Sequence, residues 1–138
     1  MVNNHNLALI IDDSATIRSL LADMLSKNGF QALSAETMEL ALQDAGRKNF
    51  DIAIVDIFMP GMGGIEGISK IREISPNAKI IAISAGHGDM EKDMALKAAV
   101  IQGADATLAK PFEEEALMAA INALLNNEEA DIEDASAA

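Results

Sequence analysis

The chain has 138 residues, and 50% of them are hydrophobic, which suffices for one domain with a buried core. Its formal net charge of -12 argues against direct nucleic-acid binding and against binding to anionic lipid, because both normally need clustered Lys and Arg. The absence of cysteine excludes disulfides, thiolate nucleophiles and cysteine-ligated metals. No apolar run approaches the roughly 18 residues of a membrane span, and the N-terminus lacks a signal-peptide pattern, so we expect a cytoplasmic protein.

Short β-type apolar runs alternate along the chain with segments of helical spacing. Strands are predicted at residues 7–11, 31–35, 51–55, 78–84 and 105–109, and helices at 14–28, 37–48, 64–74, 89–102 and 112–125. Asn28-Gly29 and Gly103 are expected to end helices, because glycine adopts the left-handed conformation without steric cost. Met90 and Met94 are interpreted as core residues of the fourth helix, with an adaptable docking surface as the alternative.

This alternation predicts an α/β domain over residues 1–125. A (βα)5 chain of this size corresponds to a flavodoxin-like, doubly wound, five-stranded parallel sheet with strand order 2-1-3-4-5. Residues 126–138 carry five acids and no base and lack apolar periodicity. We expect them to form a disordered acidic tail, with a partner-binding tail as the alternative.

In a doubly wound sheet, the loops at the carboxyl ends of the strands form the functional site. Those ends carry Asp12-Asp13-Ser14, Asp56, Ser84 and Lys110. Three neighbouring carboxylates repel one another unless a cation lies between them, and oxygen ligands of this kind favour Mg2+. Lys110 and Ser84 could then bind phosphoryl oxygens, and Asp56 is the natural nucleophile because a carboxylate can accept phosphate as an acyl phosphate.

Each of these residues also has an ordinary structural interpretation when it is taken alone. Asp12-Asp13-Ser14 could simply cap the first helix. Asp56 could be a turn residue, Ser84 a hydroxyl bonded to backbone and Lys110 a solvated side chain. Their joint occurrence at four strand ends of one sheet favours the functional interpretation.

Four motifs, "LIIDDSATIRSLL", "DIAIVDIFMPGMGGIEGI", "IIAISAG" and "LAKPF", resemble the receiver domain of two-component response regulators. The resemblance covers residues 6–125 and is nearest to single-domain, chemotaxis-type regulators. It implies that Asp56 accepts a phosphoryl group from the phosphohistidine of a sensor histidine kinase, from a phosphotransfer protein or from a small phosphodonor.

The resemblance also implies roles for the other site residues and for partners. Asp12, Asp13, Asp56 and the backbone carbonyl of Phe58 are expected to hold Mg2+, while Ser84 and Lys110 contact the phosphoryl group. The Lys110-Pro111 peptide is expected to be cis. Phosphorylation would switch the face formed by the fourth helix, fifth strand and fifth helix, which a downstream protein partner reads. The family often has an aromatic residue where this chain has Thr107. In this chain, an aromatic ring at that position therefore cannot couple phosphorylation to the change of this face.

We therefore expect a phosphoprotein of a two-component system that acts as a signalling switch rather than as an enzyme. It would be a monomer or a phosphorylation-dependent dimer, and phosphorelay signal transduction would run through protein contacts. Three alternatives are kept: a receiver fragment of a larger regulator or hybrid histidine kinase, a receiver-like module that is never phosphorylated, and an Asp-nucleophile phosphatase. The last would place two Asp residues two positions apart after the first strand, whereas Asp12 and Asp13 are adjacent.

Overall fold

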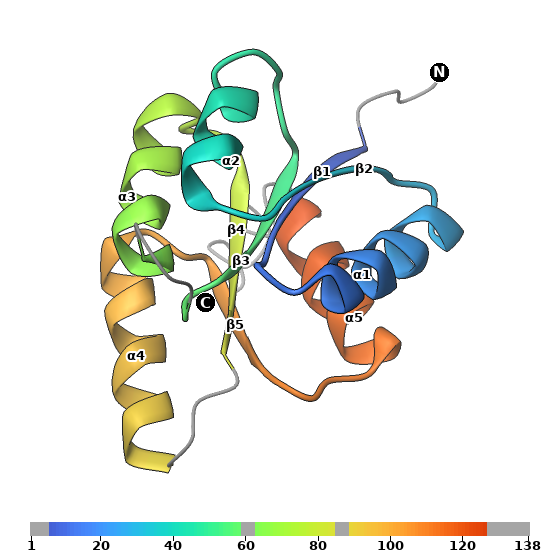
Figure 1. The fold of residues 1–138 in the computed structure, drawn as a ribbon. Coiled ribbons are helices and arrows are strands. Elements are labelled where there is room, and N and C mark those ends of the chain that lie inside the picture. Colours follow the sequence, from blue (N-terminus) through green and yellow to red (C-terminus); the bar gives the residue numbers. More distant parts are fainter. Residues whose placement is uncertain (1–5, 59–62, 85–88, 127–138) are drawn as a thin grey trace, which may run out of the picture.

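Five strands and five helices alternate along the part of the chain that the computed structural model describes, residues 6–58, 63–84 and 89–126 (Figure 1). The strands are β1 (Leu7–Ile11), β2 (Gln31–Ala35), β3 (Ile52–Asp56), β4 (Lys79–Ser84) and β5 (Ala106–Ala109). The helices are α1 (Ala15–Lys27), α2 (Met38–Ala45), α3 (Gly64–Ile74), α4 (Asp89–Gln102) and α5 (Glu114–Leu125). The predicted alternation is confirmed.

The strands form one parallel sheet in the order β2-β1-β3-β4-β5, which is the predicted flavodoxin-like order. Helices α2, α3 and α4 cover one face, and α1 and α5 cover the other (Figure 1). Every connection is therefore a crossover, and all five strands end at the same edge of the sheet.

The side chains of the central strands alternate between two hydrophobic cores. Leu9 and Val55 pack with residues of α2, α3 and α4, whereas Ile10 and Ile54 pack with residues of α1 and α5. Strands β1, β3 and β4 are almost wholly buried, as expected for parallel strands with helices on both faces. Side chains at the ends of these strands therefore stand on a rigid support.

Most element boundaries match the sequence-based prediction within two residues. Gly29 and Gly103 have φ of 90° and 128°, so both predicted helix stops are confirmed. Helix α2 ends at Ala45, although the sequence predicted a helix to residue 48. Gly46 caps it, and the high conformational entropy of glycine makes it a poor residue on which to continue a helix.

Three findings on the helices differ from, or add to, the sequence analysis. Met94 is 65% exposed, so its interpretation as a core residue is wrong, and Met90 lies outside the residues whose side chains are described. None of the helices in the described part of the chain combines the length and the hydrophobicity needed to cross a bilayer. Helix α3 approaches the end of β3 so closely that a Cβ atom at Gly64 would overlap the backbone of Asp56 and Ile57.

Candidate functional site

The predicted site residues all lie at one edge of the sheet. Asp12 directly follows β1, Asp56 is the last residue of β3, Ser84 is the last residue of β4, and Lys110 directly follows β5. Because these strands are neighbours and parallel, the register alone brings Asp56 beside Ile83 and Ser84 beside Ala109. The fold thus gathers groups that are almost a hundred residues apart in the chain.

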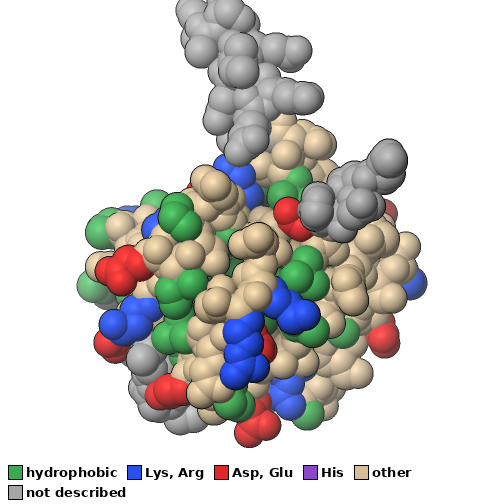
Figure 2. Space-filling view, turned by 90° about the horizontal axis from the view of Figure 1, so that it is seen from above, with side chains coloured by type: hydrophobic (Ala, Val, Ile, Leu, Met, Phe, Trp, Pro, Cys, Tyr) green, Lys and Arg blue, Asp and Glu red, His purple; other side chains and the backbone are tan. Residues whose placement is uncertain are grey.

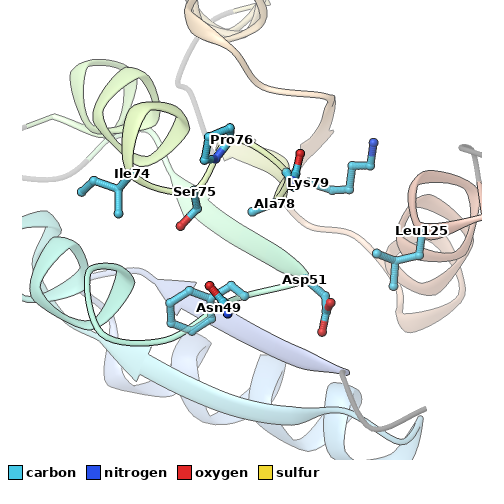
Figure 3. A pocket seen from close by; sticks show the side chains of 10 residues that line it. Asn49, Asp51, Ile74, Ser75, Pro76, Ala78, Lys79 and Leu125 are labelled. Carbon is cyan, nitrogen blue, oxygen red and sulfur yellow. The ribbon is translucent and has the colours of Figure 1, made fainter. Parts of the chain in front are cut away.

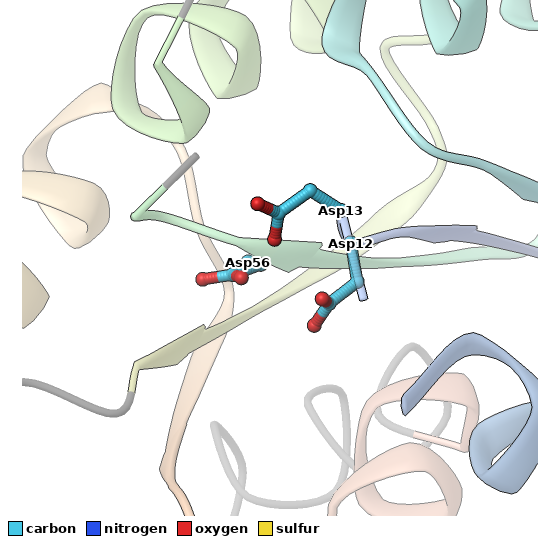
Figure 4. A group of neighbouring side chains, drawn as sticks. All are labelled: Asp12, Asp13 and Asp56. Carbon is cyan, nitrogen blue, oxygen red and sulfur yellow. The ribbon is translucent and has the colours of Figure 1, made fainter. Parts of the chain in front are cut away.

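The carboxylates of Asp12, Asp13 and Asp56 form a cluster. One oxygen of each lies within 4.8 Å of the others, and the three side chains face a shared space (Figure 4). Asp12 is 0% exposed and Asp56 is 5% exposed, whereas Asp13 is on the surface. The cluster can therefore be reached from solvent on the side of Asp13.

Asp12 is held from three directions. Its Oδ1 accepts a hydrogen bond from the Ser14 backbone N–H at 2.9 Å, and its Oδ2 accepts one from Lys110 Nζ at 3.0 Å. Its backbone carbonyl accepts a hydrogen bond from Arg18 Nη1 at 2.8 Å. Ser14 also caps α1, because its Oγ accepts from the Ile17 N–H at 3.2 Å. This loop therefore both caps α1 through Ser14 and places Asp12 in the carboxylate cluster.

Asp56 is held more loosely. Its Oδ1 accepts a hydrogen bond from the Phe58 backbone N–H at 2.9 Å, and its Oδ2 lies 3.6 Å from Lys110 Nζ. Burial raises the pKa of the Asp56 carboxyl above its ordinary value, and the like charges of Asp12 and Asp13 add to this effect. The Phe58 N–H and the Lys110 charge act in the opposite direction without cancelling it. The charged form of Asp56 is therefore less favoured than that of an exposed aspartate.

Ser84 and Lys110 complete the edge. Ser84 is fully buried, and its backbone carbonyl accepts a hydrogen bond from the Lys110 N–H at 2.8 Å, which joins the ends of β4 and β5. The Lys110 side chain is only 17% exposed. The Lys110-Pro111 peptide is cis, as expected.

The donor set fits a hard divalent cation. Among the described residues it offers three carboxylates against one ammonium group, so negative charge is in excess. Mg2+ favours one or two carboxylates and retains several waters, and the exposure of Asp13 leaves the cluster open to water on that side. The predicted backbone ligand, the carbonyl of Phe58, follows Asp56 by two residues at the same edge.

Two features of this edge were missed by the sequence analysis. One is the hydrogen bond from Arg18 to the Asp12 carbonyl; the position of Arg18, one turn after Ser14, was the available clue. The other is an apolar pocket of about 420 Å3 beside Lys110. The pocket is lined by Ile17, Leu20, Leu21, Lys110, Pro111 and Phe112.

A second groove lies at the opposite edge of the sheet, where β3 and β4 begin (Figure 3). It measures about 490 Å3, and the side chains of Asn49, Asp51, Ser75 and Lys79 give it a polar lining. It is separated from the carboxylate cluster by the length of the strands.

On the face drawn in Figure 2, Lys and Arg side chains are interspersed with Asp and Glu side chains, whereas nucleic-acid binding normally uses a clustered basic surface.

Comparison with known proteins gives a consistent result. Residues 8–122 match the model of the response regulator receiver domain. The chain is 37% identical over 120 residues to the chemotaxis protein CheY of Bacillus subtilis, covering 86% of this chain and 96% of that protein.

Two solved structures are also similar. A CheY-like response regulator receiver domain protein from Methanospirillum hungatei superposes with a TM-score of 0.82 at 26% identity, covering 93% of this chain and 99% of that one. A response regulator from Burkholderia pseudomallei, solved with a phosphorylated aspartic acid, a calcium ion and citrate, gives a TM-score of 0.76 at 28% identity. That match covers 94% of this chain and 73% of the other.

Proposed function

This chain belongs to the response regulator receiver domain family, and from that premise we propose that it is a phosphorylation-dependent switch with Asp56 as the phosphoacceptor. The observation that carries the proposal is the cluster of Asp12, Asp13 and Asp56 carboxylates beside Lys110. The phosphorylated aspartic acid and the calcium ion in the Burkholderia pseudomallei relative support both the acceptor and the cation site.

Asp12, Asp13, Asp56 and the Phe58 carbonyl would hold Mg2+, which when bound supplies positive charge against the carboxylates and the transferred phosphoryl oxygens. An Asp56 oxygen forms the new bond to phosphorus as the bond between phosphorus and the donor's histidine nitrogen breaks. The Lys110 ammonium group, which pairs with both Asp12 and Asp56, can also form an ion pair with a phosphoryl oxygen. Ser84 supplies a hydroxyl from the neighbouring strand end.

The phosphodonor must bring its histidine to this edge, and we propose that it docks on the apolar pocket beside Lys110. Leu20 is 49% exposed at that pocket, although it is a large apolar residue. An apolar helix of a histidine kinase or phosphotransfer protein would cover it. The pocket borders the cation site through Lys110, so docking there places the donor next to Asp56.

Output is proposed to run through protein contacts on the face of α4, β5 and α5. Met94 and Ile101 are 65% and 80% exposed on α4, which supplies apolar surface for a partner or for a phosphorylation-dependent dimer. We also propose residues 1–125 as the receiver domain, because α5 ends at Leu125. Residues 127–138, most of the predicted acidic tail, lie outside the described residues.

The proposal is tested by incubating the protein with acetyl phosphate and Mg2+ and measuring its intact mass. One added phosphoryl group is expected, and the Asp56→Asn variant should gain none. Omission of Mg2+ should also suppress the reaction. Labelling that survives Asp56→Asn would move the acceptor to another residue and overturn the assignment.

A further inference from the structure

We propose that Arg18 is a positioning residue for the cation site, because it fixes the peptide from which the Asp13 carboxylate projects. This inference rests on the proposed Mg2+-dependent function. Arg18 is not one of the three clustered carboxylates, and it is distinct from Ser84 and Lys110. Arg18 lies on α1, six residues after Asp12, and its side chain turns back toward the loop that follows β1.

Arg18 Nη1 donates a hydrogen bond to the Asp12 carbonyl at 2.8 Å. That carbonyl belongs to the peptide unit that joins Asp12 to Asp13. A peptide unit is planar, so fixing its oxygen also fixes the Asp13 nitrogen and thus the direction in which the Asp13 residue begins. Arg18 therefore acts on Asp13 through the backbone.

Asp12 has other restraints, whereas the Asp13 side chain has none from the residues that the structure describes. The Asp12 N–H donates to the Ala35 carbonyl at 3.2 Å, and the Asp12 carboxylate is bonded to Ser14 and Lys110. The Asp13 carboxylate is exposed and makes no hydrogen bond or ion pair with any residue in the described ranges. The place of the Asp13 carboxylate in the cluster thus depends on its backbone. The Arg18 side chain holds that backbone through its hydrogen bond to the Asp12 carbonyl.

The surroundings of Arg18 favour this role over that of an ordinary surface charge. Arg18 lines a pocket of about 300 Å3 together with Glu36 and Asp44. Neither acid forms an ion pair with it in the part of the chain that the structure describes. The guanidinium instead donates to a neutral carbonyl of the cation-binding loop. A planar guanidinium loses little rotamer freedom per bond formed, so it suits this fixing role.

Two effects of Arg18 on a bound cation have opposite signs. Its positive charge repels a cation, whereas its orientation of Asp13 favours binding. Arg18 is half-buried, so solvent and salt screen the repulsion. A misdirected carboxylate ligand is not compensated by solvent in this way. The geometry points to a net gain in affinity from Arg18.

The test is the Mg2+ dissociation constant of the metal-free protein, measured by NMR titration without any phosphodonor. Arg18→Met, which keeps the apolar stem and removes the donor and the charge, should bind Mg2+ about tenfold more weakly. Arg18→Lys, which retains the charge and one donor group, should lie between Arg18→Met and the native protein. Arg47→Met removes the same charge from an exposed side chain remote from the cluster and should leave the constant unchanged.

A double-mutant cycle shows whether Arg18 acts through Asp13. In an Asp13→Asn background, Arg18→Met should have little further effect on Mg2+ binding, because the ligand that it positions is already lost. Equal or tighter Mg2+ binding by Arg18→Met would overturn the inference, as would a full tenfold loss in the Asp13→Asn background. If Arg18→Met does not fold, as judged by circular dichroism, Arg18→Lys and Arg18→Gln carry the same comparison.

The outcome also separates this inference from the proposed function. A native protein that binds no Mg2+ and accepts no phosphoryl group would overturn the proposed function itself. A native protein that does both, paired with an Arg18→Met variant of unchanged Mg2+ affinity, would overturn only the role of Arg18.

Discussion

Lys110 bridges the two buried carboxylates of the site: its Nζ lies 3.0 Å from Asp12 Oδ2 and 3.6 Å from Asp56 Oδ2. The shorter contact is to the carboxylate that is not the proposed acceptor. The negative charge of Asp56 is therefore less well paired with the Lys110 ammonium group than that of Asp12, which agrees with the raised pKa of Asp56. In the described part of the chain, one lysine, directly after β5, thus contacts both buried carboxylates.

Replacement of Lys110 should affect stability and switching in different ways. We expect Lys110→Met to lower the free energy of unfolding of the metal-free protein by about 1–3 kcal/mol. Among the described residues, it leaves the buried Asp12 carboxylate with only the Ser14 N–H as a partner. Acetyl phosphate should still label Asp56, whereas the phosphorylation-induced change in hydrogen exchange of β5 and α5 should be lost.

The control for Lys110→Met is Lys48→Met, which removes an exposed ammonium group from the opposite edge of the sheet. Both measurements should be unchanged in it. An unaltered hydrogen-exchange response in phosphorylated Lys110→Met would contradict the role assigned to Lys110.

The raised pKa of Asp56 predicts a pH-dependent effect of Asp56→Asn on stability. Because the folded-state pKa lies above the ordinary value of 3.8, the folded protein binds more protons than the unfolded chain between the two values. Stability therefore falls as pH rises through this window, and the cost of the buried charge is fully present above it. Asp56→Asn removes that cost, so it should be more stable at pH 7 by on the order of 1 kcal/mol.

The difference between the two proteins should vanish below about pH 4, where the unfolded-state carboxyl is also protonated. Urea unfolding at several pH values in the presence of a chelator measures it. Addition of Mg2+ should reverse the order, because only the native protein retains all three carboxylates. A variant that was less stable than the native protein at pH 7 without Mg2+ would argue against a destabilising charge on Asp56.

Helix α3 supplies a matched pair of glycine substitutions. A Cβ at Gly64 would overlap the Asp56 carbonyl and the Ile57 Cα, which are backbone atoms and cannot turn aside. A Cβ at Gly63 would meet nothing within 4 Å, and Gly63 has φ of -71°, which alanine adopts readily. Gly64→Ala should therefore cost about 1–3 kcal/mol, whereas Gly63→Ala should be neutral or slightly stabilising.

Because the overlap at Gly64 falls on the residue proposed to be phosphorylated, Gly64→Ala should also slow labelling by acetyl phosphate. Gly63→Ala serves as the control for both thermal unfolding and labelling. Equal stability of the two variants would show that α3 can move away from β3 without cost.

The parts of the site that could be predicted from sequence are those fixed by topology. Parallel strands bring their carboxyl ends together, so the positions of Asp56, Ser84 and Lys110 followed from the strand assignment alone. The Arg18 contact depends on a side-chain rotamer, which periodicity does not encode. Likewise, the spacing of methionines identifies a helix face, but only the packing of the whole domain decides whether Met94 on that face is covered.

The close approach of α3 to β3 could not be predicted from the sequence either. The sequence predicted a helix from residue 64, where α3 begins. Which glycine touches backbone depends on the crossing of helix and strand in three dimensions. The distinction between Gly63 and Gly64 therefore required the structure.

Arg72 joins the end of α3 to the end of α4. Its Nη1 donates to the carbonyls of Pro76 and Ala78 at 2.9 and 2.6 Å, and its Nη2 donates to the Gly103 carbonyl at 2.8 Å. Nη2 also lies 2.7 Å from Asp105 Oδ2, which accepts the Ile80 N–H at 2.8 Å as well.

The ion pair of Arg72 and Asp105 is partly exposed, with side chains that are 28% and 31% accessible, so the pair itself should contribute little. The three carbonyl contacts should matter more, because Arg72→Met removes the donor from all of them at once. We expect Arg72→Met to cost about 2 kcal/mol and Asp105→Asn, which retains an oxygen for the Ile80 N–H, to cost less than about 1 kcal/mol. Urea unfolding in low and high salt measures both, and the cost of Arg72→Met should persist in high salt, since bonds to neutral carbonyls are screened less than an ion pair. A cost that disappeared in high salt would show that Asp105, rather than the carbonyl groups, is the main partner of Arg72.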